Sequence, residues 1–154
     1  MGKCFSFIIV MVFSAILLNC SSAAVSPNSP NVKLIYAAED NNIAGVEEAI
    51  KNGANINCRS KKGYTALMWA AFYNNLTMAE LLVNKGAIVN AKDHDGMTAL
   101  MYASHMGSKK VLTFLIANNA KINDKDKNGG TALNEAIMNG HVEVVEVLLE
   151  NGAI

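Results

Sequence analysis

The chain has 154 residues, of which 51% are hydrophobic and 6% are aromatic. This length and composition are enough for one modest domain with a buried core. Thirteen basic and thirteen acidic side chains give a formal net charge of zero, so no overall electrostatic field directs the chain to nucleic acid or to an acidic partner.

Residues 1–24 have the layout of an export signal. Lys3 supplies an early positive charge, Phe5 to Leu18 form an apolar run, and Ser22-Ala-Ala24 offers the small residues that signal peptidases prefer. The run of 14 residues is shorter than the roughly 18 that a membrane span needs. We therefore expect a cleaved leader rather than a permanent membrane helix or a buried core helix. The mature chain is then expected in the periplasm, in the cell envelope or outside the cell.

Two lipid-attachment patterns overlap this leader. Leu17-Leu-Asn-Cys20 resembles a bacterial lipobox, which implies that Cys20 becomes a lipidated first residue and anchors the chain to a membrane. Asn19 departs from the small residue that usually precedes such a cysteine, so lipidation at Cys20 and cleavage after Ala24 both stay open. Residues 1–6 also fit the N-myristoylation pattern, with Cys4 available for palmitate, but the apolar run behind them favours export.

Residues 25–30 contain both prolines of the chain. Because proline has no backbone N–H to donate, we expect an extended tether between the leader and the rest of the chain. Beyond Cys20 the sequence has a single cysteine, Cys58, so no disulfide framework stabilises the fold. We expect Cys58 to be a small surface residue rather than a redox thiol.

The remainder of the chain repeats every 33 residues. Thr65-Ala-Leu-Met-Trp-Ala70 returns as Thr98-Ala-Leu-Met-Tyr-Ala103 and as Thr131-Ala-Leu-Asn-Glu-Ala136. A second string keeps the same period, at residues 52–54, 85–87, 118–120 and 151–153. Two independent strings with one period predict a stack of repeat units, which we place at 31–57, 58–90, 91–123 and 124–154.

Each unit is expected to contain two short helices. Thr65, Thr98 and Thr131 stand just ahead of apolar runs, where a hydroxyl caps the start of a first helix. Two further columns hold only Gly or Asn, which adopt the left-handed conformation at helix ends. These columns end the first helix at Asn41, Asn74, Gly107 and Gly140, and the second helix at Gly53, Gly86, Asn119 and Gly152.

Apolar columns between these stops predict a core that neighbouring units share. One helix pair cannot bury such a face alone, so an array needs about three or more units. The first helix contributes Leu34, Leu67, Leu100 and Leu133 beside Ala37, Ala70, Ala103 and Ala136. The second contributes Val46, Ala79, Leu112 and Val145, then Ala49, Leu82, Leu115 and Leu148, and finally Ile50, Val83, Ile116 and Leu149.

The two ends of the array differ. In the first unit Val32 stands in the column of capping threonines, and Glu48 replaces an apolar residue, as expected for a cap that meets water. The last unit keeps an internal pattern from His141 to Leu149. This pattern predicts either a longer array or a last unit that docks on a partner or on another copy of the chain.

With these motifs, the sequence resembles the ankyrin-repeat family over residues 31–154. The resemblance implies an all-α solenoid of about four helix-turn-helix units with hairpin loops between them. The family pattern Thr-Pro-Leu-His has become Thr-Ala-Leu-Met at 65–68 and 98–101, and Thr-Ala-Leu-Asn at 131–134. We therefore expect the hydrogen bonds that the histidine usually makes to be missing.

In proteins that the chain resembles, arrays bind other proteins through a concave face, which consists of the hairpin tips and the exposed side of each first helix. We expect this concave face to bind a protein partner whose identity the sequence does not reveal. Aromatic and methionine side chains gathered on one patch are typical of binding anchors. The matching residues are Lys61, Lys62, Tyr64, Phe72, Tyr73, His94, Asp95, Met97, His105, Met106, Lys127, Asn128, Gly130, Met138 and Asn139, with Glu39 and Asp40 in the first unit and Trp69 and Tyr102 beside the patch.

Other functions find less support. No nucleophile elbow, phosphate loop or catalytic carboxylate pair occurs, so we expect neither an enzyme nor a cofactor. Asp93, His94, Asp95 and His105 are metal-ligand types, but Asp93 has a repeat equivalent in Asp126, which indicates a turn-forming role and no metal site. Lysines between 109 and 127 are interrupted by aspartates and indicate a solvated face rather than a nucleic-acid site. The alternative to partner binding is a structural role, in which copies of the chain stack through the last unit.

Overall fold

The computed structural model describes residues 27–154, which form four helix pairs and no strand. The first helices of the pairs are α2 (Pro30–Glu39), α4 (Ala66–Phe72), α6 (Ala99–His105) and α8 (Ala132–Met138). The second helices are α3 (Ile43–Lys51), α5 (Leu76–Asn84), α7 (Lys109–Ala117) and α9 (Val142–Glu150).

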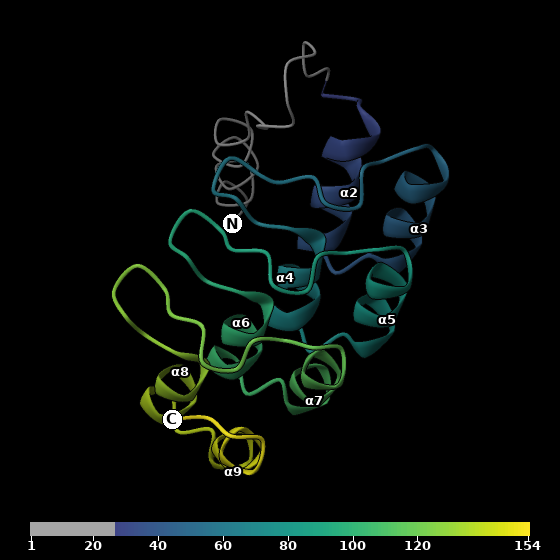
Figure 1. The fold of residues 1–154 in the computed structure, drawn as a ribbon. Coiled ribbons are helices and arrows are strands. Elements are labelled where there is room, and N and C mark those ends of the chain that lie inside the picture. Colours follow the sequence, from purple (N-terminus) through teal and green to yellow (C-terminus); the bar gives the residue numbers. More distant parts are fainter. Residues whose placement is uncertain (1–26) are drawn as a thin grey trace, which may run out of the picture.

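Figure 1 shows the first helices in one row and the second helices in another, with the loops between units projecting beyond the first row. This confirms the predicted all-α solenoid. No helix within residues 27–154 has the length and apolar character that crossing a membrane requires. The predicted leader, including Cys20, lies outside the described residues.

The helix boundaries confirm the predicted capping signals. The hydroxyls of Thr65, Thr98 and Thr131 accept hydrogen bonds from backbone amides three residues on, at 3.4, 3.3 and 3.3 Å. All eight Gly and Asn residues of the two stop columns have positive φ, between 52° and 89°. The repeat pattern therefore identifies the starts of α4, α6 and α8 and the ends of all eight helices within residues 27–154.

The first unit begins earlier than its threonine column indicates. Ser29 caps α2, because its Oγ accepts from the Val32 amide at 3.4 Å, and the helix starts at Pro30. Proline is tolerated there because its missing N–H would have no partner in the first turn. Val32 thus lies buried inside the helix, and Pro30, the last residue of the predicted tether, is its first residue.

The core runs through the whole stack. Leu34, Leu67 and Leu100 are fully buried in successive units, whereas Leu133 in the last unit is half-buried. The column of Ala49, Leu82, Leu115 and Leu148 is buried throughout. The outermost predicted column is half-buried, and Leu149 at its end is exposed. Of the five predicted apolar columns, the first four therefore face the core, and Leu133 and Val145 in the last unit are less buried than their equivalents in earlier units.

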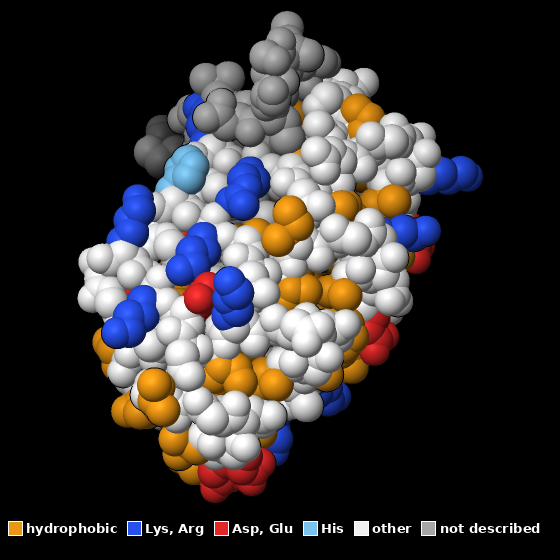
Figure 2. Space-filling model, viewed as in Figure 1, with side chains coloured by type: hydrophobic (Ala, Val, Ile, Leu, Met, Phe, Trp, Pro, Cys, Tyr) orange, Lys and Arg blue, Asp and Glu red, His pale blue; other side chains and the backbone are white. Residues whose placement is uncertain are grey.

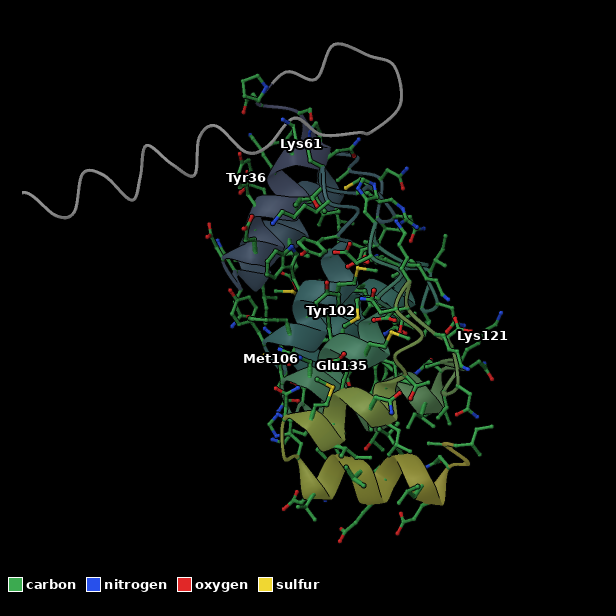
Figure 3. All side chains as sticks on the ribbon, turned by 90° about the vertical axis from the view of Figure 1, so that its left-hand side faces the viewer. Tyr36, Lys61, Tyr102, Met106, Lys121 and Glu135 are labelled. Atoms are coloured by element: carbon green, nitrogen blue, oxygen red, sulfur yellow. The ribbon has the colours of Figure 1, made fainter. Side chains whose placement is uncertain are left out.

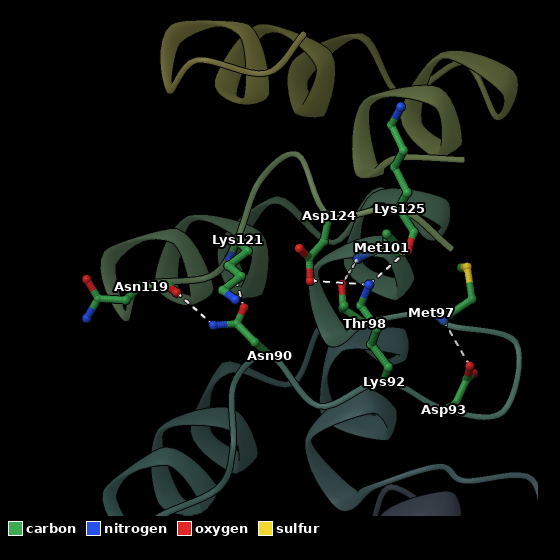
Figure 4. Close-up of polar contacts among 10 residues, drawn as sticks. All are labelled: Asn90, Lys92, Asp93, Met97, Thr98, Met101, Asn119, Lys121, Asp124 and Lys125. Carbon is green, nitrogen blue, oxygen red and sulfur yellow. Dashed lines mark hydrogen bonds and ion pairs between the residues drawn. The ribbon is translucent and has the colours of Figure 1, made fainter. Parts of the chain in front are cut away.

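A column of asparagines joins each unit to the next. Asn90 Nδ2 donates to the Asn119 carbonyl at 3.0 Å, and its Oδ1 accepts from the Lys121 amide at 2.8 Å (Figure 4). Asn57 and Asn123 make the equivalent pair of bonds with the turns that follow α5 and α9. An amide side chain can do this because it is both donor and acceptor. The sequence analysis missed this column, although its members are 33 residues apart.

The hairpin loops also lie against one another. The His94 amide donates to the Lys62 carbonyl at 3.0 Å, and the Lys127 amide donates to the Asp95 carbonyl at 2.9 Å. Gly96 has a φ of +84°, and a Cβ there would meet the Lys127 nitrogen at 3.0 Å. Glycine is required at this position because the next hairpin approaches so closely.

Two expectations about single residues are wrong. Cys58 is not on the surface: it is 2% exposed, and its Sγ lies 3.5 Å from the Asn31 carbonyl oxygen. Asn134 restores the hydrogen bonds expected to be lost with the family histidine, because its Oδ1 accepts from the Thr131 amide at 2.9 Å. Together with the Thr131 cap, this completes a capping box in the last unit.

Replacement of Leu100 by Ala should lower the free energy of unfolding by roughly 2–5 kcal/mol, because Leu100 is buried between neighbouring units. Urea unfolding followed by circular dichroism measures this change. Ile88→Ala is the matched control, since that side chain is 56% exposed and should cost less than about 1 kcal/mol. An unchanged unfolding midpoint for the Leu100 variant would contradict the assigned register.

Candidate functional site

The hairpin tips and the first helices share one side of the molecule, which is the concave face defined above. Figure 3 looks onto this side, where Tyr36, Tyr102 and Glu135 follow one another from α2 through α6 to α8. Trp69 occupies the same column in α4. This column therefore presents three aromatic side chains and then a carboxylate along the face.

Aromatic side chains of units 2 and 3 meet on the concave face. The Tyr64 ring lies 5.4 Å from Trp69 and 5.8 Å from Tyr102, with interplanar angles of 73° and 88°. Trp69 also meets Phe72 edge to face at 5.8 Å and stacks on Tyr73 at 6.2 Å. Such edge-to-face pairs are favourable because the positive ring edge meets the negative ring face. We call these five residues the aromatic cluster.

A pocket of about 140 Å³ opens within the aromatic cluster. Met68 and four of the rings, those of Tyr64, Trp69, Phe72 and Tyr102, line it. Trp69 Nε1 is buried and has no hydrogen-bond partner among the described residues. The pocket is thus an apolar hollow with aromatic walls.

Asp93 supports one wall of this pocket. Its Oδ2 accepts from the Tyr102 hydroxyl at 2.6 Å, and its Oδ1 accepts from the amides of Asp95 and Met97 at 2.8 and 2.9 Å. The residue is only 7% exposed. Burial, followed by this bond to Asp93, raises the pKa of Tyr102 well above its ordinary value.

The turn-forming role predicted for Asp93 is confirmed. Asp126 makes the equivalent bonds one unit later, to the amides of Asn128 and Gly130 at 2.8 and 2.7 Å. An aspartate that binds amides two and four residues ahead holds a hairpin loop in shape. Among residues 27–154, no three His, Cys, Asp or Glu side chains are grouped in a way that could hold a metal ion.

Units 1 and 2 are joined on the same face. The Tyr73 hydroxyl donates to the Glu39 carbonyl at 2.9 Å. Burial raises the pKa of the Glu39 carboxyl, the charge of Asp40 raises it further, and the positive charge of Lys62 opposes both. The predicted residues Glu39, Lys62 and Tyr73 are therefore brought into one neighbourhood.

A polar cluster links units 3 and 4. His105 Nδ1 lies 2.8 Å from Glu135 Oε2 and 3.1 Å from Asn139 Nδ2. Asn139 also donates to the Glu135 carbonyl at 2.8 Å. Glu135 was not among the predicted contact residues, although its place in the column of Trp69 and Tyr102 could have identified it.

The other predicted contact residues are spread along the face. Figure 2 shows Lys and Arg side chains following one another down the side that carries the hairpins, with few acidic side chains among them.

The methionines of the face differ in their burial. Met97 is half-buried against the core, and Met106 is 41% exposed at the end of α6. Asn128 and Met138 line a separate hollow of about 480 Å³ on the last unit. The hairpin tips carry Lys61, Lys62, His94, Asp95, Lys127 and Asn128.

Comparison with family models identifies the repeat type. A model described as ankyrin repeats in three copies matches residues 34–126, and one described as ankyrin repeats in many copies matches residues 107–149. A search of curated proteins finds no match.

Tyr102→Phe should make stability less sensitive to alkaline pH. Because the folded state holds the Tyr102 proton more tightly than the unfolded state, this contribution is complete below the ordinary pKa of 10.0 and is lost as pH rises above it. Near pH 8 the variant should lose about 1–3 kcal/mol with its bond to a carboxylate. The difference from the parent chain should shrink towards pH 11.

Chemical denaturation at pH 8, 9.5 and 11 measures this change. Tyr36→Phe, in the same column, controls for the loss of a phenol. If the free energies of unfolding of the parent chain and of Tyr102→Phe differ by the same amount at all three pH values, the tyrosine–aspartate bond does not act as described.

Proposed function

The chain belongs to the ankyrin-repeat family, and we propose that it is an exported module that binds another protein across its concave face. Ankyrin repeats generally act as protein–protein interaction modules, and the family is typically a non-enzymatic scaffold. The aromatic cluster on the concave face is the observation that carries the proposal.

The fold does not require these rings. In the last unit, Gly130 occupies the place of Tyr64, Glu135 that of Trp69 and Asn139 that of Tyr73, yet α8 and α9 pair as the other units do. Tyr73 remains 41% exposed. Aromatic side chains that a fold does not need, gathered on an accessible surface, are typical of the anchors that dominate protein interfaces.

Charge also distinguishes the two sides of the array. The hairpins carry a succession of lysines, whereas the outer column of the second helices presents Glu47, Glu80, Thr113 and Glu146 to solvent. The aspartates within the hairpins are partly engaged, since Asp93 binds Tyr102 and Asp124 pairs with Lys92 at 3.5 Å. A partner with an apolar anchor and acidic surroundings would complement the concave face.

The double substitution Tyr64→Ala and Phe72→Ala should weaken partner capture by more than about ten-fold, because it removes two walls of the aromatic pocket. Affinity capture from the native host with immobilised chain, followed by titration of the captured protein, measures the loss. Glu80→Ala with Thr113→Ala is the matched control on the outer side and should bind as before. Full retention of the partner by the double variant would refute binding through this face.

A second candidate function is assembly of copies of the chain through the last unit. Ile137 is 58% exposed, whereas Ala71 and Ser104, in the same column of units 2 and 3, are fully buried against the following unit. Leu149, in α9 of the same unit, is 53% exposed. The last unit thus presents an internal kind of face, which a second copy would cover.

Sedimentation of the leaderless chain tests this second function. Association that rises with protein concentration and is abolished by Ile137→Glu would support it, because a charge on this face opposes burial. Lys110→Glu, on the exposed surface of α7, is the control. A strict monomer at the highest soluble concentration excludes self-stacking.

The export component of the proposal rests on the leader pattern in residues 1–24. We expect the mature chain from the native host to begin at Val25, or at a lipidated Cys20 that anchors it to a membrane. Mass spectrometry of the mature N-terminus separates these outcomes. A chain that retains residues 1–24 would contradict export by this leader.

A further inference from the structure

The pocket within the aromatic cluster has the dimensions and walls of a binding site for a small group. A water molecule needs roughly 10–15 Å³ of such space, so about 140 Å³ accommodates a group of several heavy atoms. Its walls are four aromatic rings and the thioether of Met68. A group that enters this pocket therefore meets mainly aromatic carbons and a polarizable sulfur.

The rings stand as adjacent walls rather than as a flat stack. Tyr64 is nearly perpendicular to both Trp69 and Tyr102, at 73° and 88°, and Phe72 is nearly perpendicular to Trp69, at 77°. Neighbouring rings set at right angles form the corners of a box. The face of an aromatic ring carries partial negative charge, so a ring face turned into this box favours a cation over a neutral group of the same size.

A carboxylate lies behind one wall. The Tyr102 hydroxyl donates to Asp93 Oδ2 at 2.6 Å, which places a buried negative charge beside the pocket and increases the electron density of the ring. The attraction of Asp93 for a positive group is strengthened because its surroundings are largely shielded from water.

The residues that line the pocket indicate which kind of cation it would bind. A primary ammonium carries three N–H donors, each of which needs an acceptor when it leaves water. A quaternary ammonium has no N–H and spreads its charge over methyl groups. It therefore loses less hydration free energy than a primary ammonium when it enters an aromatic pocket. We propose that the pocket formed by Tyr64, Met68, Trp69, Phe72 and Tyr102 binds a trimethylammonium group, as carried by choline or by a choline headgroup. This goes beyond protein binding and does not depend on it.

Trp69 reports directly on this site because it is the single tryptophan of the chain. Titration of the mature protein with choline should change Trp69 fluorescence saturably. The neutral isostere 3,3-dimethylbutanol has carbon in place of the charged nitrogen and should bind at least about five-fold more weakly. Equal or tighter binding of the isostere, or no saturable response to choline, would overturn the proposal.

Phe72→Leu tests the π contribution with little change in apolar volume and without loss of the reporter. Choline affinity should fall several-fold while the weak affinity for the isostere stays the same. Ile88→Leu, at an exposed position outside the lining, should leave both affinities unchanged. If Phe72→Leu leaves choline binding intact, the pocket does not act as an aromatic cage.

Vesicles then distinguish the source of the group. Cosedimentation with phosphatidylcholine vesicles but not with phosphatidylethanolamine vesicles would assign the site to a lipid headgroup. Binding of free choline without cosedimentation would assign it to a soluble ligand, and both results support the cage. Because none of these measurements uses a protein partner, failure of the cage would leave the proposed protein interaction untouched.

Discussion

Contact between neighbouring units is the interaction on which the rest of this structure depends. The helices α4, α6 and α8 have seven residues each, well below the roughly 12 at which an isolated helix becomes even marginally stable. Leu67 and Leu100 are buried because adjacent units cover them, and the asparagines at 57, 90 and 123 tie each unit to the next turn. No unit has a complete core of its own, so a single unit is not expected to fold without its neighbours.

The same constraint decides where the chain is free to vary. Stacking fixes the residues between units, but it leaves the hairpin tips and one side of each first helix uncovered. In units 2 and 3 those free positions carry the aromatic cluster, and in unit 4 they carry Gly130, Glu135 and Asn139. Asp93 has a part in both the fold and the pocket. It holds its hairpin in shape by accepting from two backbone amides, and it also binds the Tyr102 hydroxyl. A residue that the repeat needs for its turn thereby sets the charge beside a candidate binding pocket.

Much of the fold could be predicted from the sequence because it depends on local signals repeated at a fixed period. A capping threonine or a left-handed Gly or Asn acts within a few residues, so Thr98 and Gly107 behave as their neighbours in sequence indicate. Features set by packing between units were harder to predict. Cys58 is buried beside Asn31 of the preceding unit, which only stacking brings close to it. The bond between Tyr102 and Asp93 joins a first helix to the hairpin of its own unit, and the start of α2 depends on Ser29 and Pro30, which lie outside the repeated threonine column. The aromatic residues were predicted to lie on one face, but their enclosure of a pocket was not.

Native-state hydrogen exchange, resolved by helix, tests the central claim most directly. If stability comes from neighbouring units, amides in α4 to α7, which have a unit on either side, should open with the highest free energy. Amides in α8 and α9 should exchange distinctly faster, since their outer face is exposed at Ile137 and Leu149. Equal protection of α8 and α9 with α4 to α7 would contradict the claim that the units are stabilised mainly by their neighbours.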